Sequence, residues 1–302
     1  MFSSLLFSLF FETVEPSYGT LLQFFPETVI AGAPSTLTLA PQQQAPLKTG
    51  VSIGPVIEAR SVYAMDLASG TPLFVRDIFT RRHIASIAKL VTAMVILDAH
   101  KLDEKTTVSQ NAATQEGSSM KLKRGEQITV ENLLTGMLVN SGNDAAVALA
   151  ELDAGNESHF VEKMNEKAQA LGLKDTHFSN AKGFDEPANY STAFDTMIFA
   201  RAALTYPFIK KTAATKTGDV ASVDGKTHHR LESTNELLEH SSFHVIGLKT
   251  GHTPEAGESF VSLALTSDGH EILSVMLDSP NRFKETKILL DWIYRNFAFP
   301  KA

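Results

Sequence analysis

The spacing of apolar residues changes twice along this chain, and this change limits the folds that the chain can adopt. Residues 61–66 and 72–75 are short apolar segments on either side of a turn at residues 68–70, which predicts a β-hairpin. Apolar residues then recur about every 3.6 residues, the period of an amphipathic helix, in segments 87–100, 130–139, 143–154, 157–173 and 191–204. The sequence therefore predicts two strands followed by a long helical region.

Strand-like segments return near the end of the chain. Residues 243–251, 258–267 and 270–279 are short and apolar, and residues 282–297 predict a final amphipathic helix. Strands at both chain ends with helices between them predict an α+β fold, in which the two ends form an antiparallel sheet with flanking helices and an inserted helical lobe. We expect a catalytic cleft between the sheet and the lobe.

The composition changes near residue 50, which sets the predicted domain boundary. Residues 1–11 are apolar, but no Lys or Arg precedes Lys48, so they predict either a degenerate or truncated export or anchor segment or a plain hydrophobic tail. Residues 31–50 are rich in Ala, Pro, Gln, Ser and Thr and predict a linker. We therefore expect an N-terminal segment and linker over residues 1–50 and one folded domain over residues 51–302.

The charge and residue content exclude several functional classes. The net charge is -7 and no basic stripe is present, so nucleic acid is not an expected partner. The absence of cysteine excludes disulfides, thiolate metal sites and a cysteine nucleophile. The ten histidines are scattered and form no H-E-x-x-H pattern, so we predict neither a metal nor another cofactor.

Three short motifs in a fixed order carry the chemistry of this sequence. They are residues 86–89 (Ser-Ile-Ala-Lys), 141–143 (Ser-Gly-Asn) and 249–251 (Lys-Thr-Gly). Such a set supplies a serine nucleophile, a lysine that can take its proton, a polar bridge and a second lysine, which suffices for acyl transfer without histidine or metal. Ser86 lies near the start of an apolar helix, where positions three apart share a face, so the Lys89 amine can reach its hydroxyl.

Each motif has further copies, and their contexts differ. S-x-x-K recurs at residues 118–121, S-x-N at 233–235 and 279–281, and K-T-G at 48–50 and 216–218. The copy at 118–121 precedes a segment with no helical pattern, whereas Ser141 joins two amphipathic helices through a polar turn and Lys249 ends an apolar strand. We therefore assign the site to Ser86, Lys89, Ser141, Asn143 and Lys249.

With these residues the chain resembles the serine D-alanyl-D-alanine carboxypeptidases, which are low-molecular-weight penicillin-binding proteins. The resemblance spans about residues 51–297 and is carried by residues 82–97, 117–151, 189–195, 233–238 and 247–257. It implies a β-lactamase/transpeptidase-like fold and removal of the terminal D-alanine from peptidoglycan pentapeptide stems through an acyl-enzyme. It further implies that β-lactams inhibit covalently and that the protein acts outside the cytoplasm, in the periplasm or on the outer face of the cytoplasmic membrane.

The resemblance implies a role for each motif residue. Ser86 resembles the nucleophile and Lys89 the base that activates it. Ser141 would relay a proton to the leaving amine with Lys249 beside it, and Asn143 would orient Lys89 and hold the substrate amide.

The family's substrate-binding positions also have counterparts in this sequence. The backbone N–H groups of Ser86 and His252 would form the oxyanion hole. Thr250 would bind the terminal carboxylate of the substrate, and Gly251 admits a close approach of the backbone. Arg282 matches an arginine that attracts this carboxylate, although a plain surface charge at the helix start is also open. The C-terminal β-domain and amphipathic tail of some members have no counterpart in this sequence, so we expect any membrane tether at the N-terminus.

The proposed base must be uncharged to accept a proton. The ordinary pKa of a lysine amine is about 10.4, so we expect burial and the charge of Lys249 to lower the pKa of Lys89. Lys249 itself is expected to stay positive and to favour an anionic substrate end.

Three alternatives stay open at this point. An endopeptidase of the same family would use the same serine on cross-links. A class A β-lactamase shares the motif order, but it usually carries Asp where this chain has Gly142, and Glu186 only superficially resembles its deacylating glutamate. A wall-binding relative without catalysis is disfavoured because all three motifs are intact.

Overall fold

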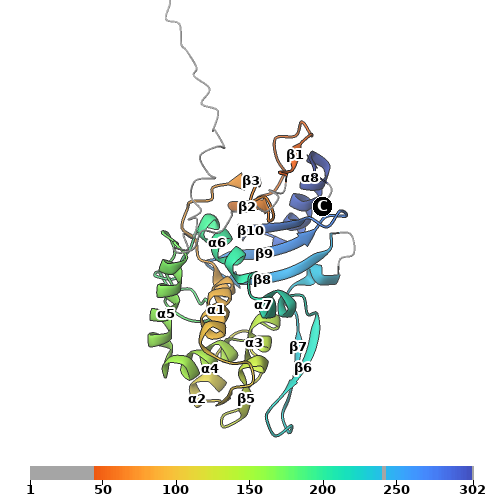
Figure 1. The fold of residues 1–302 in the computed structure, drawn as a ribbon. Helices are drawn as coiled ribbons and strands as arrows, with labels where there is room; N and C mark the ends of the chain where they lie inside the picture. Colours follow the sequence, from red (N-terminus) through yellow and green to blue (C-terminus); the bar gives the residue numbers. More distant parts are fainter. Residues whose placement is uncertain (1–43, 240–242, 301–302) are drawn as a thin grey trace, which may run out of the picture. The chain divides into compact units, whose positions relative to one another are not determined.

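The computed structural model describes residues 44–239 and 243–300, so the predicted N-terminal apolar segment lies outside the described residues. These residues belong to one compact unit, Gln42–Ala302. Its centre is a five-stranded antiparallel sheet in the order β3-β2-β10-β9-β8 (Figure 1). The strands are β2 (Ser61–Asp66), β3 (Pro72–Arg76), β8 (Val245–Thr253), β9 (Gly257–Leu265) and β10 (Glu271–Ser279). The predicted α+β fold, with a sheet made by the two chain ends, is confirmed.

Helices cover both faces of this sheet, so most residues of its central strands are buried on both sides. Val62 and Ala64 of β2 share an apolar cluster with Leu290 of α8 (Arg282–Asn296), which packs on β9 and β10. Successive strand residues point to opposite faces. Tyr63, between those two, accordingly stacks on Phe194 of α6 (Ala193–Ala203) with ring centroids 6.3 Å apart.

The helical lobe surrounds α1 (Lys89–Ala99), whose buried side chains contact α3, α4, α5 and α6. The other helices are α2 (Gln110–Ala113), α3 (Val130–Val139), α4 (Asn143–Ala154), α5 (Glu157–Ala170) and α7 (Pro207–Ala213). Polar caps fix several helix starts: the side chains of Thr129, Asn156, Thr192 and Asn281 each accept a hydrogen bond from the N–H three residues later. All five predicted lobe helices are present.

The structure also contains elements that the sequence pattern does not predict. Two small two-stranded sheets, β4 (Lys105–Thr107) with β5 (Gln127–Thr129) and β6 (Thr217–Ala221) with β7 (His228–Glu232), consist mostly of polar residues and so give a weak strand signal. Part of the predicted linker, β1 (Leu47–Lys48), pairs with β11 (Phe297–Ala298). The described residues also contain the short 3₁₀ turns η2 (Ala85–Ala88) and η3 (Glu236–Glu239). None of the helices in the described part of the chain has the length and apolar content needed to cross a membrane.

Candidate active site

The first motif lies where η2 meets α1, at the boundary between the sheet and the lobe. Ser86 is in the 3₁₀ turn and Lys89 is the first residue of α1, so the nucleophile segment opens on a 3₁₀ turn rather than an α-helical one. Residues three apart are eclipsed in a 3₁₀ turn. The Lys89 Nζ accordingly donates a hydrogen bond of 2.7 Å to the Ser86 Oγ.

Lys89 is held by further oxygen acceptors in a fully buried position. Its Nζ donates to the Asn143 Oδ1 at 2.7 Å and to the Lys182 carbonyl oxygen at 2.7 Å. Burial, followed by the positive charges of Lys249 and Lys182, holds the pKa of Lys89 well below its usual range. The predicted direction for the pKa of this amine therefore agrees with its surroundings.

The second motif meets the third where the helical lobe contacts β8. Ser141 connects α3 to α4 in a left-handed backbone conformation with φ of 58°, and its hydroxyl faces β8. The Lys249 Nζ donates to the Ser141 Oγ at 3.0 Å and to the Thr250 carbonyl at 3.0 Å. Burial, followed by the nearby Arg282 charge, lowers the pKa of Lys249 to about 7. Burial therefore works against the permanent positive charge that the sequence analysis expects for this amine.

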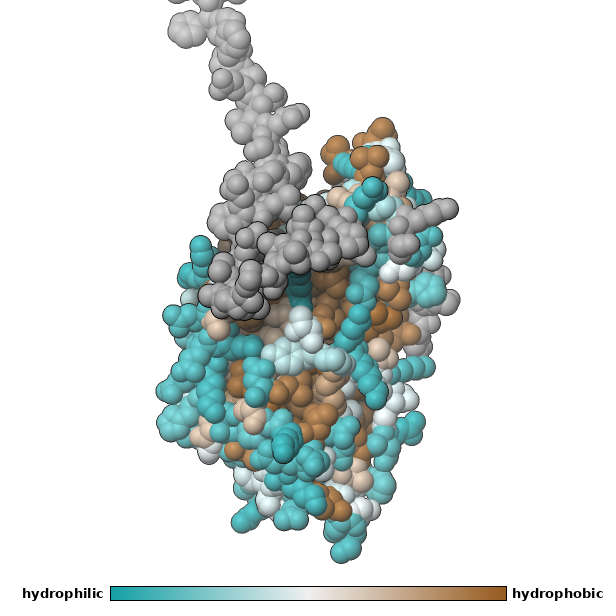
Figure 2. Space-filling view, viewed as in Figure 1, coloured by the Kyte–Doolittle hydropathy of each residue, from teal (hydrophilic) through white to brown (hydrophobic). Residues whose placement is uncertain are grey.

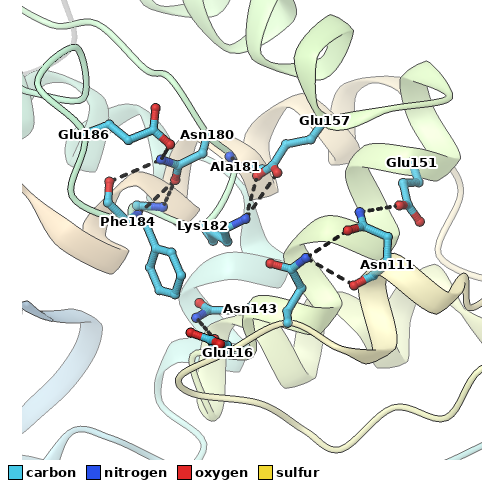
Figure 3. A network of polar contacts seen from close by, with 12 residues as sticks. Asn111, Glu116, Asn143, Glu151, Glu157, Asn180, Ala181, Lys182, Phe184 and Glu186 are labelled. Carbon is cyan, nitrogen blue, oxygen red and sulfur yellow. Dashed lines mark hydrogen bonds and ion pairs between the residues drawn. The ribbon is translucent and has the colours of Figure 1, made fainter.

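Asn143 begins α4 and connects the two sides of the site. Its Oδ1 accepts from Lys89, and its Nδ2 donates to the Glu116 carbonyl at 2.7 Å. Figure 3 shows Asn143 facing Glu116. Its backbone N–H donates to the Ser118 carbonyl at 2.7 Å. The amide orientation is thus fixed from both ends, and it presents an oxygen to the lysine.

The strand β8 forms the opposite wall. It is an edge strand, so half of its backbone N–H and C=O groups face away from β9. A Cβ at Gly251 would lie 2.8 Å from the Ile84 carbonyl oxygen, which shows how closely this strand packs on the residues before η2. His252 follows, pairs with Glu258 of β9 and has an exposed side chain.

The remaining predicted residues extend this wall. The Thr250 Oγ1 lies 2.5 Å from the Thr234 Oγ1, and the Arg282 Nη1 donates to the Gly251 carbonyl at 2.9 Å. Arg282 is the first residue of α8, and its Nε is buried without a hydrogen-bond partner among the described residues. A half-buried guanidinium with a free donor next to β8 is suited to an anionic ligand.

Two contributors were not singled out from the sequence. The main-chain oxygen of Lys182 accepts a hydrogen bond from the Lys89 amine. Every residue carries such an oxygen, so the sequence does not reveal this contact. Gly183 has φ of 85°, and a Cβ there would lie 2.0 Å from the Ala85 carbonyl oxygen and 2.9 Å from the Ser86 nitrogen. The glycine at position 183 was the only sequence signal for this contact, because a positive φ and a close backbone approach both favour glycine.

The further copies of the motifs, which the sequence analysis did not assign to the site, lie in other elements. The Ser119 Oγ of the second S-x-x-K donates to the Asp144 Oδ2 at 2.7 Å and so supports the start of α4. Lys48 belongs to β1, and Lys216 directly precedes the β6–β7 hairpin. The bonded hydroxyls and amines of the site come from residues 86–89, 141–143 and 249–251, the copies that sequence context selected. Two other copies border the site, through the Ser118 carbonyl and the Thr234 hydroxyl.

The site consists of two hydroxyls, two buried amines and a set of polar acceptors. Among the described residues, no group of three or more His, Cys, Asp or Glu side chains is arranged to hold a metal ion. A serine hydroxyl bound to an amine of lowered pKa is an activated nucleophile, and a second hydroxyl–amine pair opposite it can carry a proton. This arrangement fits acyl transfer.

Comparisons with known sequences agree with this geometry. A family model described as D-alanyl-D-alanine carboxypeptidase matches residues 48–281. The chain is 36% identical over 262 residues to D-alanyl-D-alanine carboxypeptidase DacD of Escherichia coli K12, covering 81% of this chain and 65% of that protein. It is 34% identical over 247 residues to DacF of Bacillus subtilis, covering 80% of this chain and 63% of that protein. The chain thus spans slightly less than two thirds of the length of these relatives.

Solved structures show the same likeness. The Streptomyces K15 DD-transpeptidase superposes with a TM-score of 0.75 at 31% identity, covering 81% of this chain and all of that one (100%). A D-alanyl-D-alanine carboxypeptidase from Mycobacterium tuberculosis superposes with a TM-score of 0.73 at 30% identity, covering 83% of this chain and 96% of that one. The predicted resemblance and fold are confirmed by these matches.

Proposed function

Because this chain belongs to the D-alanyl-D-alanine carboxypeptidase family, we propose that it hydrolyses the terminal D-alanine from peptidoglycan pentapeptide stems through an acyl-enzyme. The observation that carries the proposal is the 2.7 Å contact between the Ser86 hydroxyl and a fully buried Lys89 amine. Two further contacts support the proposal: Asn143 accepts a hydrogen bond from Lys89, and Lys249 donates one to Ser141.

In the acylation step, the neutral Lys89 amine takes the proton of the Ser86 hydroxyl as its oxygen attacks the carbonyl carbon of the penultimate D-alanine. The resulting oxyanion would accept hydrogen bonds from the backbone N–H groups of Ser86 and His252. When the C–N bond breaks, the leaving nitrogen takes a proton through the Ser141 hydroxyl, which the Lys249 ammonium supports. The products of this step are free D-alanine and an ester on Ser86.

Deacylation repeats these transfers with water. Water attacks the ester carbonyl, gives its proton to the basic amine of the site, and Ser86 regains a proton as the leaving oxygen. The stem peptide departs with a new carboxylate, and the enzyme returns to its starting state.

The end of the substrate would be bound along β8. The Thr250 hydroxyl and the Arg282 guanidinium are held next to this strand and are suited to the terminal carboxylate. Binding this anion would also favour the charged form of Lys249, whose pKa burial lowers to about 7. Substrate binding would therefore supply the proton on which the leaving group depends.

The β-lactamase alternative has less support. The Glu186 carboxylate accepts a hydrogen bond from the Asn180 Nδ2 at 3.3 Å, whereas the Ser86 hydroxyl contacts Lys89 and the Lys182 carbonyl (Figure 3 shows the Asn180 contact). A β-lactam should accordingly acylate Ser86 and leave slowly, acting as a covalent inhibitor. An endopeptidase activity on D-Ala-linked cross-links would use the same residues and is the alternative within the family.

Acyl transfer to an amine is a second candidate, because the fold covers the whole Streptomyces K15 DD-transpeptidase. In that reaction an acceptor amine takes the place of water at the Ser86 ester. Adding glycine or D-amino acids to the assay and analysing products by mass spectrometry separates transfer from hydrolysis.

We propose that the protein acts outside the cytoplasm, in the periplasm or on the outer face of the cytoplasmic membrane, because the proposed peptidoglycan substrate lies there. A tether through the N-terminal segment belongs to the same proposal. Protease accessibility in intact cells tests this location.

The direct test incubates the protein with a peptide ending in D-Ala-D-Ala and measures free D-alanine. Wild-type protein should release D-alanine, and Ser86→Ala should not. Ser118→Ala, in the second S-x-x-K copy, is the matched control and should retain release. No release by a folded wild-type protein, or unchanged release by Ser86→Ala, would contradict the proposal.

A further inference from the structure

The main chain that supplies an oxygen to Lys89 is held from two helices. The Ala181 carbonyl accepts from the Thr92 Oγ1 of α1 at 2.7 Å. The Ala181 N–H donates to the Glu157 Oε1 of α5 at 2.9 Å. Both polar groups of this residue are therefore fixed, and the next carbonyl, that of Lys182, lies 2.7 Å from the Lys89 Nζ.

Glu157 also binds the side chain of the residue that follows. The Lys182 Nζ lies 3.2 Å from the Glu157 Oε2, and the two side chains are only 12% and 24% exposed. Figure 3 shows the carboxylate facing both the Ala181 nitrogen and the Lys182 ammonium. One carboxylate thus anchors two consecutive residues, in the first turn of α5, where a negative charge is favourable.

The other end of the segment is fixed independently. The Asn180 Oδ1 accepts from the N–H groups of Gly183 and Phe184 at 2.7 and 2.9 Å. Gly183 packs directly on the backbone of η2, which carries the nucleophile. Glu157 and Asn180 therefore hold the two ends of a short bridge between α5 and the reacting serine.

We propose that Glu157 is a positioning residue for the Lys89 amine, acting through the main chain of Ala181 and Lys182. This inference rests on the proposed function, because it assigns Lys89 the role of base. Glu157 touches neither Ser86 nor the substrate position, so its effect passes through the Lys182 carbonyl. Without the carboxylate, this carbonyl is free to turn away, and Lys89 loses one of the three oxygen contacts that aim it at Ser86.

Electrostatics supplies a readout that a purely structural role would not give. The pKa of Lys89 depends on its burial and on the charges of four side chains around it. These are Lys249 from β8, Lys182 from the bridge, Asp144 from α4 and Glu157 from α5. The two lysines lower the pKa of Lys89, and the two carboxylates raise it. Removing the Glu157 charge should lower that pKa, and removing the Lys182 charge should raise it.

The experiment measures the rate of acylation by a fluorescent penicillin from pH 5 to 10, with mass spectrometry to locate the label. The variants are Glu157→Gln, Glu157→Ala and Lys182→Met, and Glu162→Gln, an exposed position of the same helix, is the matched control. Glutamine keeps an oxygen for the Ala181 N–H, whereas alanine does not. The Lys182 carbonyl is present in every variant.

We expect Glu157→Ala to acylate about tenfold more slowly across the pH range, since misplaced groups lose rate steeply. Glu157→Gln should recover most of the rate, with the acidic limb of its profile moved to lower pH. Lys182→Met should move that limb to higher pH, and Glu162→Gln should match the wild type.

Two outcomes would overturn this inference: variants whose rates equal that of the wild type, or reduced rates with an unmoved acidic limb, which would indicate a structural role alone. If Glu157→Ala does not fold, the pH profiles of Glu157→Gln and Lys182→Met still test the inference, because their acidic limbs should move in opposite directions. A wild-type protein that is not labelled at Ser86 would instead refute the proposed function, so the two failures are distinguishable.

Discussion

Replacing Gly183 by alanine tests the packing of the site without removing any functional group. Gly183 has φ of 85°, and an added Cβ would lie 2.0 Å from the Ala85 carbonyl oxygen, 2.4 Å from the Ala85 carbonyl carbon and 2.9 Å from the Ser86 nitrogen. All three atoms are backbone, so no side-chain rotation can relieve the overlap. Either η2 or the segment that contains Gly183 has to move.

The size of the effect follows from this geometry. Cβ atoms essentially never approach closer than 3.0 Å, so the 2.0 Å contact must open by about 1 Å. A left-handed alanine costs about 1–2 kcal/mol, and overpacking adds about 1–3 kcal/mol. A displacement of about 1 Å at the nucleophile costs about 100-fold in rate. Gly172→Ala is the matched control, because its φ is also positive (74°) but nothing lies within 4 Å of its Cβ.

The assay combines thermal unfolding with the rate of penicillin acylation. Gly172→Ala should lose about 1–2 kcal/mol of unfolding free energy and acylate normally. Gly183→Ala should lose about 2–5 kcal/mol and acylate about 100-fold more slowly. If both variants have the same stability and the same acylation rate, the close contact between Gly183 and η2 is wrong.

Other perturbations have equally definite outcomes. Arg282→Gln should raise KM for a D-Ala-D-Ala peptide by about tenfold or more, measured by D-alanine release, because a charged hydrogen bond is worth about 1.5–3 kcal/mol. The pKa of Lys249 is about 7 in the folded protein and 10.5 in the unfolded chain, so the unfolded chain binds more protons between these two pH values. The Lys249 amine should therefore make the free energy of unfolding rise with pH. Urea unfolding of the wild type and Lys249→Met at pH 7 and 9 should show a larger rise for the wild type. Asp144→Ala should destabilise by about 3 kcal/mol in urea, since its buried carboxylate accepts from the Met120 and Leu122 N–H groups.

The sequence predicted most of the site because its residues lie in local patterns. Ser86 and Lys89 are three apart at a helix start, and this spacing alone brings hydroxyl and amine together. Lys249 was identified by the apolar strand before it, and Ser141 by the two helices around it. Apolar periodicity also predicted the strands near the two chain ends and the helices between them.

What the sequence did not reveal depends on the main chain or on distant pairing. The Lys182 carbonyl binds Lys89 through an atom that every residue carries, so residue type gives no signal. Thr234 meets Thr250 through the fold of the segment between them, and the β6–β7 hairpin is held by backbone hydrogen bonds between polar residues. The lowered pKa of Lys249 was not anticipated, because the extent of its burial depends on the packing of the whole domain.

The central claim is that Ser86 becomes nucleophilic because a buried, neutral Lys89 amine accepts its proton. Mass spectrometry of the protein after reaction with a penicillin tests this claim most directly, with peptide mapping of the adduct in wild type and Lys89→Met. The account predicts one adduct on Ser86 in the wild type and severely reduced labelling in Lys89→Met. An adduct on another residue, or labelling of Lys89→Met at the wild-type rate, would contradict it.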